Sequence, residues 1–313
     1  MRRGVALVMV MFLLTFLVVV VYQFVMTVRV DRRLARNTVA QRINYYACRG
    51  ALNLARAYIE KDGKENTLDT LNDCWATGEQ LEDLKIGDAT VEMRIVDAES
   101  LFNLANLSKQ TNKFYSRTKN GLSRLVSYLG LEEDDPDNQT IAPAVTDWID
   151  QDKKGDYEDG AENRVPRVLE ELMLVPEVTE RVYYGWIDTE AEQEYKGLRE
   201  FLTLWGSGRI NINTAPKEVL VAMSGAIDEE KADNIIEYRR EESFKTPNDL
   251  VKVSGCADVF NRDRTLRAAL TTVSTFFQVR IRSEANGCVM RVRAIVRRLP
   301  GATETVVWKE EER

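Results

Sequence analysis

An uninterrupted apolar run near the N-terminus constrains this chain more than any other feature. The run covers the 24 residues from 5 to 28, without a charge, proline or glycine, and is interrupted only by Thr15, Gln23 and Thr27. A helix of that length reaches ~36 Å, enough to cross the hydrocarbon core of a membrane with some tilt. A cleaved secretory signal is the alternative, but its apolar region is ~7–15 residues long and precedes a small-residue cleavage site, which this run lacks. The sequence predicts one membrane anchor.

The flanking charges bear on the orientation of this anchor. Arg2 and Arg3 precede the run, whereas four arginines follow it between residues 29 and 36. Lys and Arg are enriched on the cytoplasmic side of membrane spans, so this count slightly favours a cytoplasmic location for the rest of the chain.

The helix is predicted to continue beyond the membrane. No proline occurs between residues 5 and 60, and Gly50 is the only glycine there. A single helix of 56 residues is ~84 Å long, so its second half is expected to pack on a soluble domain. The apolar stripe predicted for this packing consists of Ile43, Ala47, Leu54 and Tyr58.

Residues that alternate between apolar and polar predict strands at both ends of the remaining chain. Residues 89–96 alternate, as do 273–281 and 290–296, and a last short strand is expected at 303–308. Asn286-Gly287 supplies a type I′ turn between two of them. Residues 108–270 show helical and loop-like patterns instead. We therefore expect an α+β fold in which a helical domain is inserted into an antiparallel sheet.

Composition excludes several kinds of enzyme. The chain has no histidine, which removes Ser-His-Asp and Cys-His triads, imidazole bases and zinc sites with histidine ligands. Its 43 Lys and Arg against 50 Asp and Glu give a net charge of −7, which argues against a general nucleic-acid partner. No nucleotide-binding loop or nucleophile motif occurs. We predict that no residue is catalytic.

Four segments resemble known sequence motifs. Residues 3–7, RGVAL, resemble a type IV prepilin leader that a prepilin peptidase cleaves between Gly4 and Val5. Residues 97–107, DAESLFNLANL, resemble the D-x-x-G-x-F-N-L-N-x-L signature of GspK, the large minor pseudopilin family of type II secretion. Residues 147–152, DWIDQD, with GAE at 160–162, and residues 210–216, ININTAP, resemble further elements of that family. The chain is therefore similar to the GspK family.

This resemblance implies a pilin-like fold, namely a long N-terminal helix on an antiparallel sheet. The corresponding parts are a leader (1–4), a transmembrane part (5–28), a first pilin-like part (29–107), an inserted α-helical domain (108–270) and C-terminal strands (271–313). It also implies a single-pass protein of the inner membrane with its globular part in the periplasm, contrary to the charge count, and methylation of Val5 after cleavage.

The implied function is mechanical. A minor pseudopilin of this family lies at the tip of the pseudopilus and helps to initiate its assembly for export of folded proteins across the outer membrane. The implied partners are the other minor pseudopilins of the I and J types, the major pseudopilin and the prepilin peptidase. Met9 stands where most pilins have glutamate, an absence typical of this family. A minor pilin of a type IV pilus is the alternative.

An acidic segment suggests a metal site. Residues 132–162 contain twelve carboxylates and two lysines, a net charge of −10. A solvated, self-repelling loop is one interpretation, and a calcium site with oxygen ligands is the other. The spacing does not match an EF-hand, because Lys154 and Ala161 occupy ligand positions. The resemblance implies a structural Ca²⁺ site in a looser loop, with the candidate ligands Asp150, Asp152, Asp156, Asp159 and Glu162.

Residues 210–255 also resemble the helix-hairpin-helix module of DNA-uptake proteins. In that module glycine-rich hairpins present backbone N–H groups to phosphates. Here Asp228, Glu229 and Glu230 lie where phosphate would bind, and the segment has six Lys and Arg against nine Asp and Glu. We therefore expect a structural helical fold and no nucleic-acid partner.

Four cysteines allow three pairings, among which the sequence does not choose. Cys48 with Cys74 would close a loop after the long helix, and Cys256 with Cys288 would join the inserted domain to the last hairpin. An oxidising periplasm permits both disulfides. Four buried free thiols are the alternative.

Overall fold

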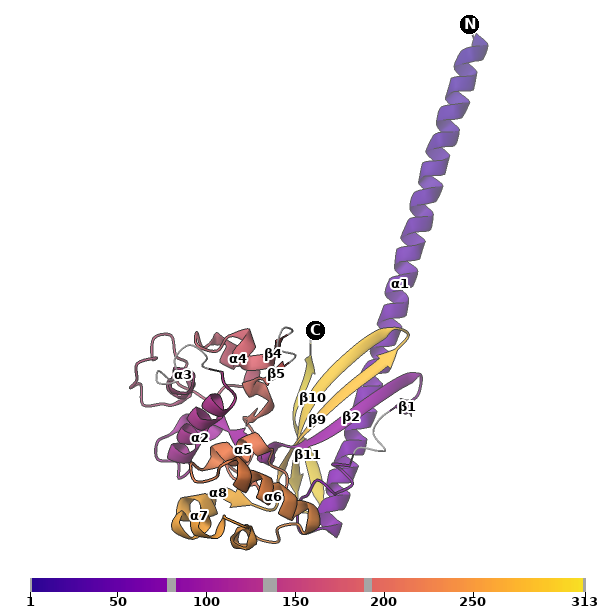
Figure 1. Ribbon diagram of the computed structural model, residues 1–313. Coiled ribbons are helices and arrows are strands. Elements are labelled where there is room, and N and C mark those ends of the chain that lie inside the picture. The colour runs from indigo at the N-terminus through magenta and orange to yellow at the C-terminus, as the bar shows by residue number, and fades with distance from the viewer. Residues whose placement is uncertain (1, 78–82, 132–139, 189–192, 312–313) are drawn as a thin grey trace.

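The computed structural model describes residues 2–77, 83–131, 140–188 and 193–311 (Figure 1). A long helix, α1 (Arg2–Glu65), projects from a body that contains a sheet and a group of short helices. The N-terminus lies at the far end of this projection, and the C-terminus lies at the body.

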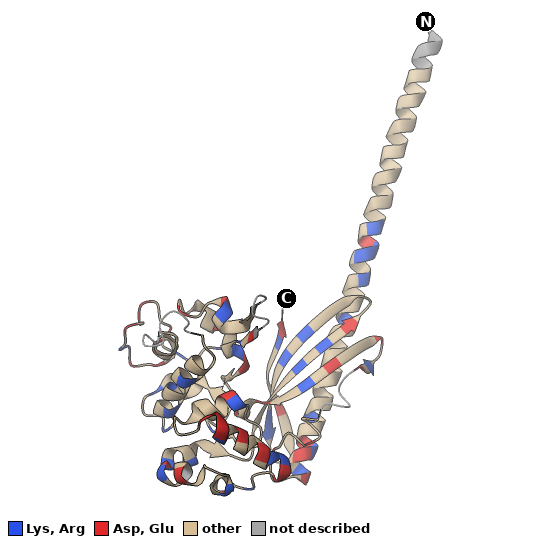
Figure 2. Ribbon diagram, in the orientation of Figure 1, with Lys and Arg blue, Asp and Glu red and all other residues tan. Residues whose placement is uncertain are grey.

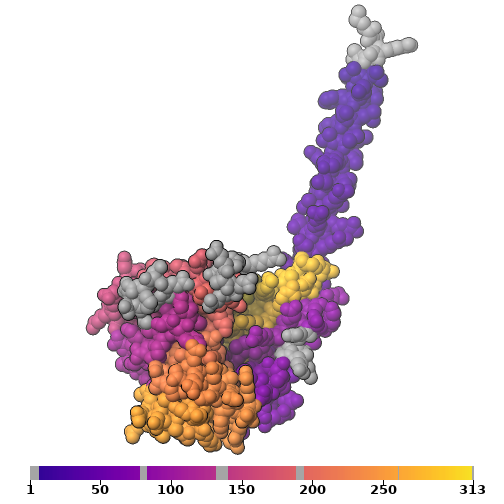
Figure 3. All heavy atoms as spheres, in the orientation of Figure 1, coloured from indigo at the N-terminus to yellow at the C-terminus, as the bar shows by residue number. Residues whose placement is uncertain are grey.

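The projecting half of α1 has the properties expected of a membrane span. The helix from Leu7 onward contains an 18-residue window with a mean hydropathy of 2.6, none of which is buried. By length and composition it is apolar enough to cross a membrane. Among the described side chains of α1, charged residues begin only towards the body (Figure 2), and Figure 3 shows this half as an isolated stalk. The Thr15 and Thr27 hydroxyls donate to the Met11 and Gln23 carbonyls at 3.1 and 3.0 Å, so neither hydroxyl would enter lipid without an acceptor.

The second half of α1 packs against the sheet through small side chains. The buried face consists mainly of Ala40, Ala47, Cys48, Ala51, Ala55 and Ile59. The predicted stripe lies along one edge of this face: Ala47 is in the core, and Ile43, Leu54 and Tyr58 are partly buried and pack against it. Small residues allow the helix backbone to approach the sheet closely, and a search for large apolar residues does not detect that face.

One five-stranded antiparallel sheet combines segments from both ends of the chain. Its strands, in the spatial order β1-β2-β9-β10-β11, are β1 (Leu84–Ile86), β2 (Ala89–Asp97), β9 (Phe276–Ala285), β10 (Cys288–Leu299) and β11 (Ala302–Glu311). The predicted split sheet is confirmed. The first C-terminal strand begins three residues later than predicted, because Val273 is exposed and lies before it.

The turn between β9 and β10 agrees with its predicted type. Asn286 and Gly287 have φ angles of 49° and 76°, as a type I′ turn requires at both central positions. The pairing of Ala285 with Cys288 continues without a shift to Phe276 with Arg297. The turn therefore sets the register between β9 and β10.

The segment between β2 and β9 consists of short helices and very short strands on the side of the sheet away from α1 (Figure 1). The α-helices are α2 (Tyr115–Tyr128), α3 (Ile141–Ile149), α4 (Glu180–Tyr184), α5 (Lys217–Met223), α6 (Glu229–Glu241), α7 (Ala257–Arg262) and α8 (Arg264–Ala269). The 3₁₀ helices are η1 (Ala98–Ser100), η2 (Leu104–Ser108), η3 (Leu169–Leu174), η4 (Leu198–Glu200) and η5 (Pro247–Lys252).

Three two-stranded ladders connect these helices. The parallel ladders join β3 (Phe102–Asn103) to β6 (Leu202–Thr203) and β7 (Ile210–Asn211) to β8 (Leu270–Thr271). The antiparallel ladder joins β4 (Gly185–Asp188) to β5 (Gln193–Lys196). These strands were not predicted, because two to four residues are too few to show an alternating pattern.

The apolar side chains form two separate cores. One lies between α1 and the five-stranded sheet and includes Trp75, Phe277 and Val279. The other fills the inserted segment and includes Phe102 and Leu122. The molecule therefore has a sheet domain and a helical domain, each with its own interior.

Candidate functional site

The acidic motif DWIDQD lies at the end of α3. Its Trp148 side chain is buried in the core of the helical domain and holds the motif in place. The helix ends at Asp150, whose extended backbone leads away from the helix while its N–H still donates to Thr146 at 2.9 Å. The apolar face of α3 thus positions the carboxylates that follow it.

Three carboxylates converge beside this helix end. One oxygen from each of Asp150, Asp152 and Glu158 lies within 4.8 Å of the other two. The Tyr115 hydroxyl donates to Asp150 Oδ2 at 2.8 Å, and Gln110 donates to Asp152 Oδ2. Burial raises the pKa of the Asp150 carboxyl, and the neighbouring Asp152 raises it further. The cluster is therefore costly unless protons or a cation neutralise it.

Two buried oxygens near this cluster have no hydrogen-bond donor among the described residues. They are Glu158 Oε1 and Asn163 Oδ1. Asn163 donates to Glu158 Oε2 at 3.2 Å and has a positive φ of 53°, so a bent loop brings the two side chains together. Buried acceptors are normally satisfied, and Ca²⁺ takes carboxylate and amide oxygens as ligands. The donor set therefore fits a hard cation.

The loop around the cluster depends on a close approach at Gly155. A Cβ atom there would lie 1.9 Å from Asp147 Oδ2. The same oxygen accepts the Tyr157 N–H at 3.1 Å. Asp147 therefore holds the loop between Asp152 and Glu158 and supports the cluster from outside it.

The structure brings together two of the five candidate ligands. Asp150 and Asp152 lie in the cluster, whereas Asp156, Asp159 and Glu162 are exposed and are not among the converging carboxylates. Glu162 instead pairs with Arg164 at 3.2 Å. Glu158 was not selected from the sequence, because the loop conformation and not the spacing turns it inward.

A second buried carboxylate cluster lies where α1 ends. Oxygens of Asp62, Asp69 and Asp73 are within 4.8 Å of one another. Arg298 of β10 pairs with Asp62 at 3.1 Å and with Asp69. The guanidinium stands between the carboxylates, so this cluster is a structural ion-pair network that ties the end of α1 to the sheet.

The motifs at 97–107 and 210–216 meet at the junction of the two domains. Asp97 is buried, and its Oδ2 accepts hydrogen bonds from Asn211 at 3.0 Å, Thr214 at 2.6 Å and Ser274 at 2.6 Å. Asn211 also donates to the Asp69 carbonyl at 3.2 Å. These family-like motifs therefore connect the sheet to the inserted domain. Spacing alone did not reveal this role.

The structure does not join either suggested cysteine pair in a disulfide. Cys48 is buried in the sheet core, and Cys74 is exposed. Cys256 lies in the helical core, whereas Cys288 is at the β9–β10 hairpin. Burial raises the pKa of Cys48 and of Cys256 to about 11, so both thiols stay protonated at neutral pH.

In the hairpin that resembles a phosphate-binding module, a carboxylate caps the helix that follows. Asp228 caps α6 by accepting the Lys231 N–H at 2.9 Å. A phosphate would have to compete with this carboxylate for the helix N-terminus. Asp228 thus already occupies one of the N–H donors that a phosphate would need.

The predicted leader cleavage site lies in the first turns of α1. Gly4 and Val5 belong to this helix, but their side chains lie outside the described part of the structure. Cleavage between Gly4 and Val5 therefore stays a prediction.

The fold defines a class of protein with a long apolar N-terminal helix whose second half packs on an antiparallel sheet, as in pilins. Comparisons with known proteins identify the family. Two family profiles, each described as type II secretion system (T2SS), protein K, match residues 100–185 and 210–272. The type II secretion system protein K of Pseudomonas aeruginosa is 28% identical over 266 residues, which cover 80% of this chain and 76% of that protein. Both profiles and this relative therefore support a place for the chain in the type II secretion system protein K family.

A solved structure agrees with this fold. A chain in the crystal structure of the GspK–GspI–GspJ complex from the type 2 secretion system of enterotoxigenic Escherichia coli superimposes with a TM-score of 0.67. The match covers 87% of this chain and 97% of that chain at 19% sequence identity. The two chains therefore share the arrangement of helix, sheet and inserted domain.

Proposed function

We propose that this chain is a minor pseudopilin at the tip of the type II secretion pseudopilus, where it helps to initiate assembly for the export of folded proteins. One observation carries the proposal: both family profiles fall on the helical domain that is inserted into a pilin-like body. Family members are parts of a secretion machine, so the function is structural and not catalytic.

The shape of the molecule favours a position at the tip. The helical domain extends sideways from the sheet, on the side away from α1 (Figure 1). In a repeating shaft every subunit is surrounded by copies, and so bulky a domain would meet its neighbours. Met9 supports the same position, because it is exposed on α1 and offers no carboxylate to the N-terminal amine of an adjacent subunit.

The partners follow from the related complex. That complex contains GspI and GspJ, so we infer that minor pseudopilins of these two types bind this chain, together with the major pseudopilin. The apolar half of α1 lies in the inner membrane, and the body lies in the periplasm. A minor pilin of a type IV pilus would instead copurify with pilus proteins, so the partner set recovered from membranes discriminates the two.

Processing by prepilin peptidase tests the class. The intact mass and N-terminal sequence of the membrane-extracted protein are measured with and without the peptidase. We expect loss of residues 1–4 and a methylated Val5. An intact Met1 in the presence of the peptidase would contradict the pilin class, and a C-terminal reporter active only in the cytoplasm would contradict the orientation.

The candidate site holds Ca²⁺ in this proposal. Asp150, Asp152, Glu158 and Asn163 supply the oxygen ligands, and the bound ion stabilises the loop that joins α3 to η3. We expect titration calorimetry of the full chain in detergent to show Ca²⁺ binding, weakened at least tenfold by Glu158→Gln. Asp159→Asn removes an exposed carboxylate of the same loop and serves as the control. Equal affinity of both variants would place the site elsewhere.

A further inference from the structure

The sheet face that points away from α1 carries a row of cations. Strand pairing places Arg94 of β2 beside Arg280 of β9, Arg280 beside Arg293 of β10, and Arg293 beside Lys309 of β11. Side chains directly opposite each other on one face start ~4.5–5.5 Å apart, and like charges there destabilise a sheet. We call these four residues the cationic row.

Among the described residues, ion pairs neutralise only one half of the cationic row. Glu170 of η3 pairs with Arg293 at 3.4 Å and with Lys309 at 2.9 Å, and Glu311 pairs with Arg293 at 2.5 Å. In the part of the chain that the structure describes, Arg94 and Arg280 form no ion pair. The charge excess is therefore concentrated on β2 and β9.

Arg280 also has an unsatisfied hydrogen-bond donor. Its Nε is buried and has no acceptor among the described residues. Burial lowers the pKa of Arg280, and the charges of Arg293, Arg199 and Arg94 lower it further. The carboxylate of Glu311 offsets these effects only in part, and an arginine remains charged in a protein. An acceptor from outside the chain would satisfy both the charge and the N–H group.

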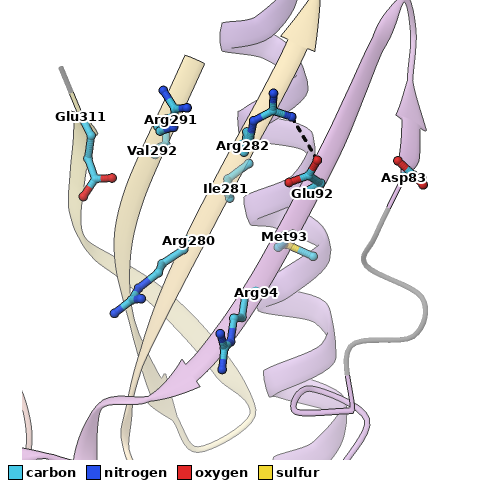
Figure 4. A pocket seen from close by; sticks show the side chains of 10 residues that line it. All are labelled: Asp83, Glu92, Met93, Arg94, Arg280, Ile281, Arg282, Arg291, Val292 and Glu311. Atoms are coloured by element: carbon cyan, nitrogen blue, oxygen red, sulfur yellow. Dashed lines mark hydrogen bonds and ion pairs between the residues drawn. The ribbon is translucent and has the colours of Figure 1, made fainter. Parts of the chain in front are cut away.

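Two cavities meet at these two arginines. One, of about 560 Å³, lies over the sheet face and is also lined by Arg282 and Arg291 (Figure 4). The other, of about 680 Å³, lies between the sheet and the helical domain and adds Arg199. Figure 4 shows Arg94 and Arg280 pointing out from neighbouring strands, with α1 on the far side of the sheet. Both arginines therefore line open hollows of the surface that a side chain of a partner could enter.

We propose that Arg94 and Arg280 bind a short acidic segment of a partner protein. Guanidinium groups bind carboxylates through paired N–H donors, and the free Arg280 Nε is one such donor. Glu92 and Glu311 line the sheet cavity as well, so a long polyanion such as a nucleic acid would meet repulsion beside the arginines. A few carboxylates on a peptide match the two uncompensated charges. This binding goes beyond the proposed function, because it involves the sheet face of the body and not the membrane helix.

A binding measurement on the full chain in detergent tests the proposal. The probe is a fluorescent hexaglutamate peptide, with hexalysine and hexaglutamine as controls, and anisotropy is recorded at two salt concentrations. We expect hexaglutamate alone to bind and its affinity to fall with salt. The variant Arg94→Gln with Arg280→Gln is expected to lose affinity at least tenfold. The matched control, Arg209→Gln with Arg262→Gln, removes two exposed charges elsewhere.

Each outcome of this binding measurement supports or overturns the proposal. Arg94→Gln alone changes an exposed side chain and is expected to weaken binding by about threefold to tenfold, which guards against misfolding of the double variant. Absence of hexaglutamate binding, or equal weakening in the matched control, would overturn the proposal. Tighter binding of single-stranded DNA at the same arginines would replace the protein partner by a nucleic acid and would also overturn it. Absence of peptide binding would leave leader cleavage unaffected. Failure of this proposal is therefore distinguishable from failure of the proposed function.

Discussion

At the scale of single residues, the chain buries carboxylates where its two domains meet. Asp97 is fully enclosed, and burial raises its pKa although four donors from other residues hold it. Glu99 accepts backbone N–H groups from Ser207 at 2.5 Å and from Thr275 at 3.2 Å. These two side chains connect β2 to chain segments more than a hundred residues away. Their protonation is therefore coupled to the stability of the junction.

The stability of the protein is predicted to depend on pH through Glu99. Burial raises the pKa of Glu99 from 4.5 to about 7. Between these pH values the folded chain retains a proton that the unfolded chain has released, so the free energy of unfolding falls as pH rises. The free energy of unfolding that is lost through Glu99 is at most about 3 kcal/mol. Denaturant unfolding, followed by tryptophan fluorescence from pH 4.5 to 8, measures it.

The variant Glu99→Gln isolates this contribution. It is expected to flatten the decline of stability between pH 4.5 and 7, whereas Glu237→Gln, which changes an exposed side chain on α6, should retain it. An unchanged decline in Glu99→Gln would assign the pH dependence to the other buried carboxylates, such as Asp69.

At the scale of elements, the β9–β10 hairpin shows how one turn sets a sheet. Its two central residues need positive φ angles, which asparagine and glycine adopt at low cost. The turn aligns Arg280 with Arg293 and Val279 with Ala294. A shift of one residue would exchange the core face for the cationic face.

The turn glycine is predicted to matter through its backbone alone. Gly287 has a φ of 76°, and a Cβ atom there would have nothing within 4 Å, so Gly287→Ala introduces strain without a clash. We expect it to lower the free energy of unfolding by about 1 kcal/mol. Gly225→Ala is the control, because its Cβ atom would meet only Arg124 at 4.0 Å. Equal stability of the two variants in denaturant unfolding would contradict this account.

At the scale of the whole molecule, a small polar junction connects two hydrophobic cores. Asn211 is fully buried and donates to Asp97, Ser274 and the Asp69 carbonyl, each on a different segment of the sheet domain. Its own oxygen accepts the Asn213 N–H at 3.0 Å. This one amide group therefore joins the helical domain to three segments of the sheet domain.

Removal of this amide is predicted to loosen the junction. Asn211→Ala leaves buried acceptors without donors and is expected to cost about 3 kcal/mol of unfolding free energy. Hydrogen exchange should accelerate at β7 and at the start of β9, while α1 within the sheet core stays protected. Asn248→Ala, at an exposed position, should change neither quantity. A loss below ~1 kcal/mol would show that apolar packing holds the domains together instead.

The sequence by itself determined the features that local periodicity encodes. The long apolar helix, the alternating strands at both ends of the soluble part and the Asn286-Gly287 turn were predicted correctly, because each depends on neighbours within a few residues. The motifs at 97–107 and 210–216 also indicated the family.

Only the tertiary structure decided which residues meet. It selected alanines as the contact face of α1, because close packing depends on the shape of the opposing sheet. It turned Glu158 toward Asp150 and left Asp159 exposed, because the loop conformation outweighs spacing. It joined Asp97 to Asn211 and aligned Arg94 with Arg280. These pairs are 114 and 186 residues apart, so chain topology and strand register bring them together, and no local pattern encodes either.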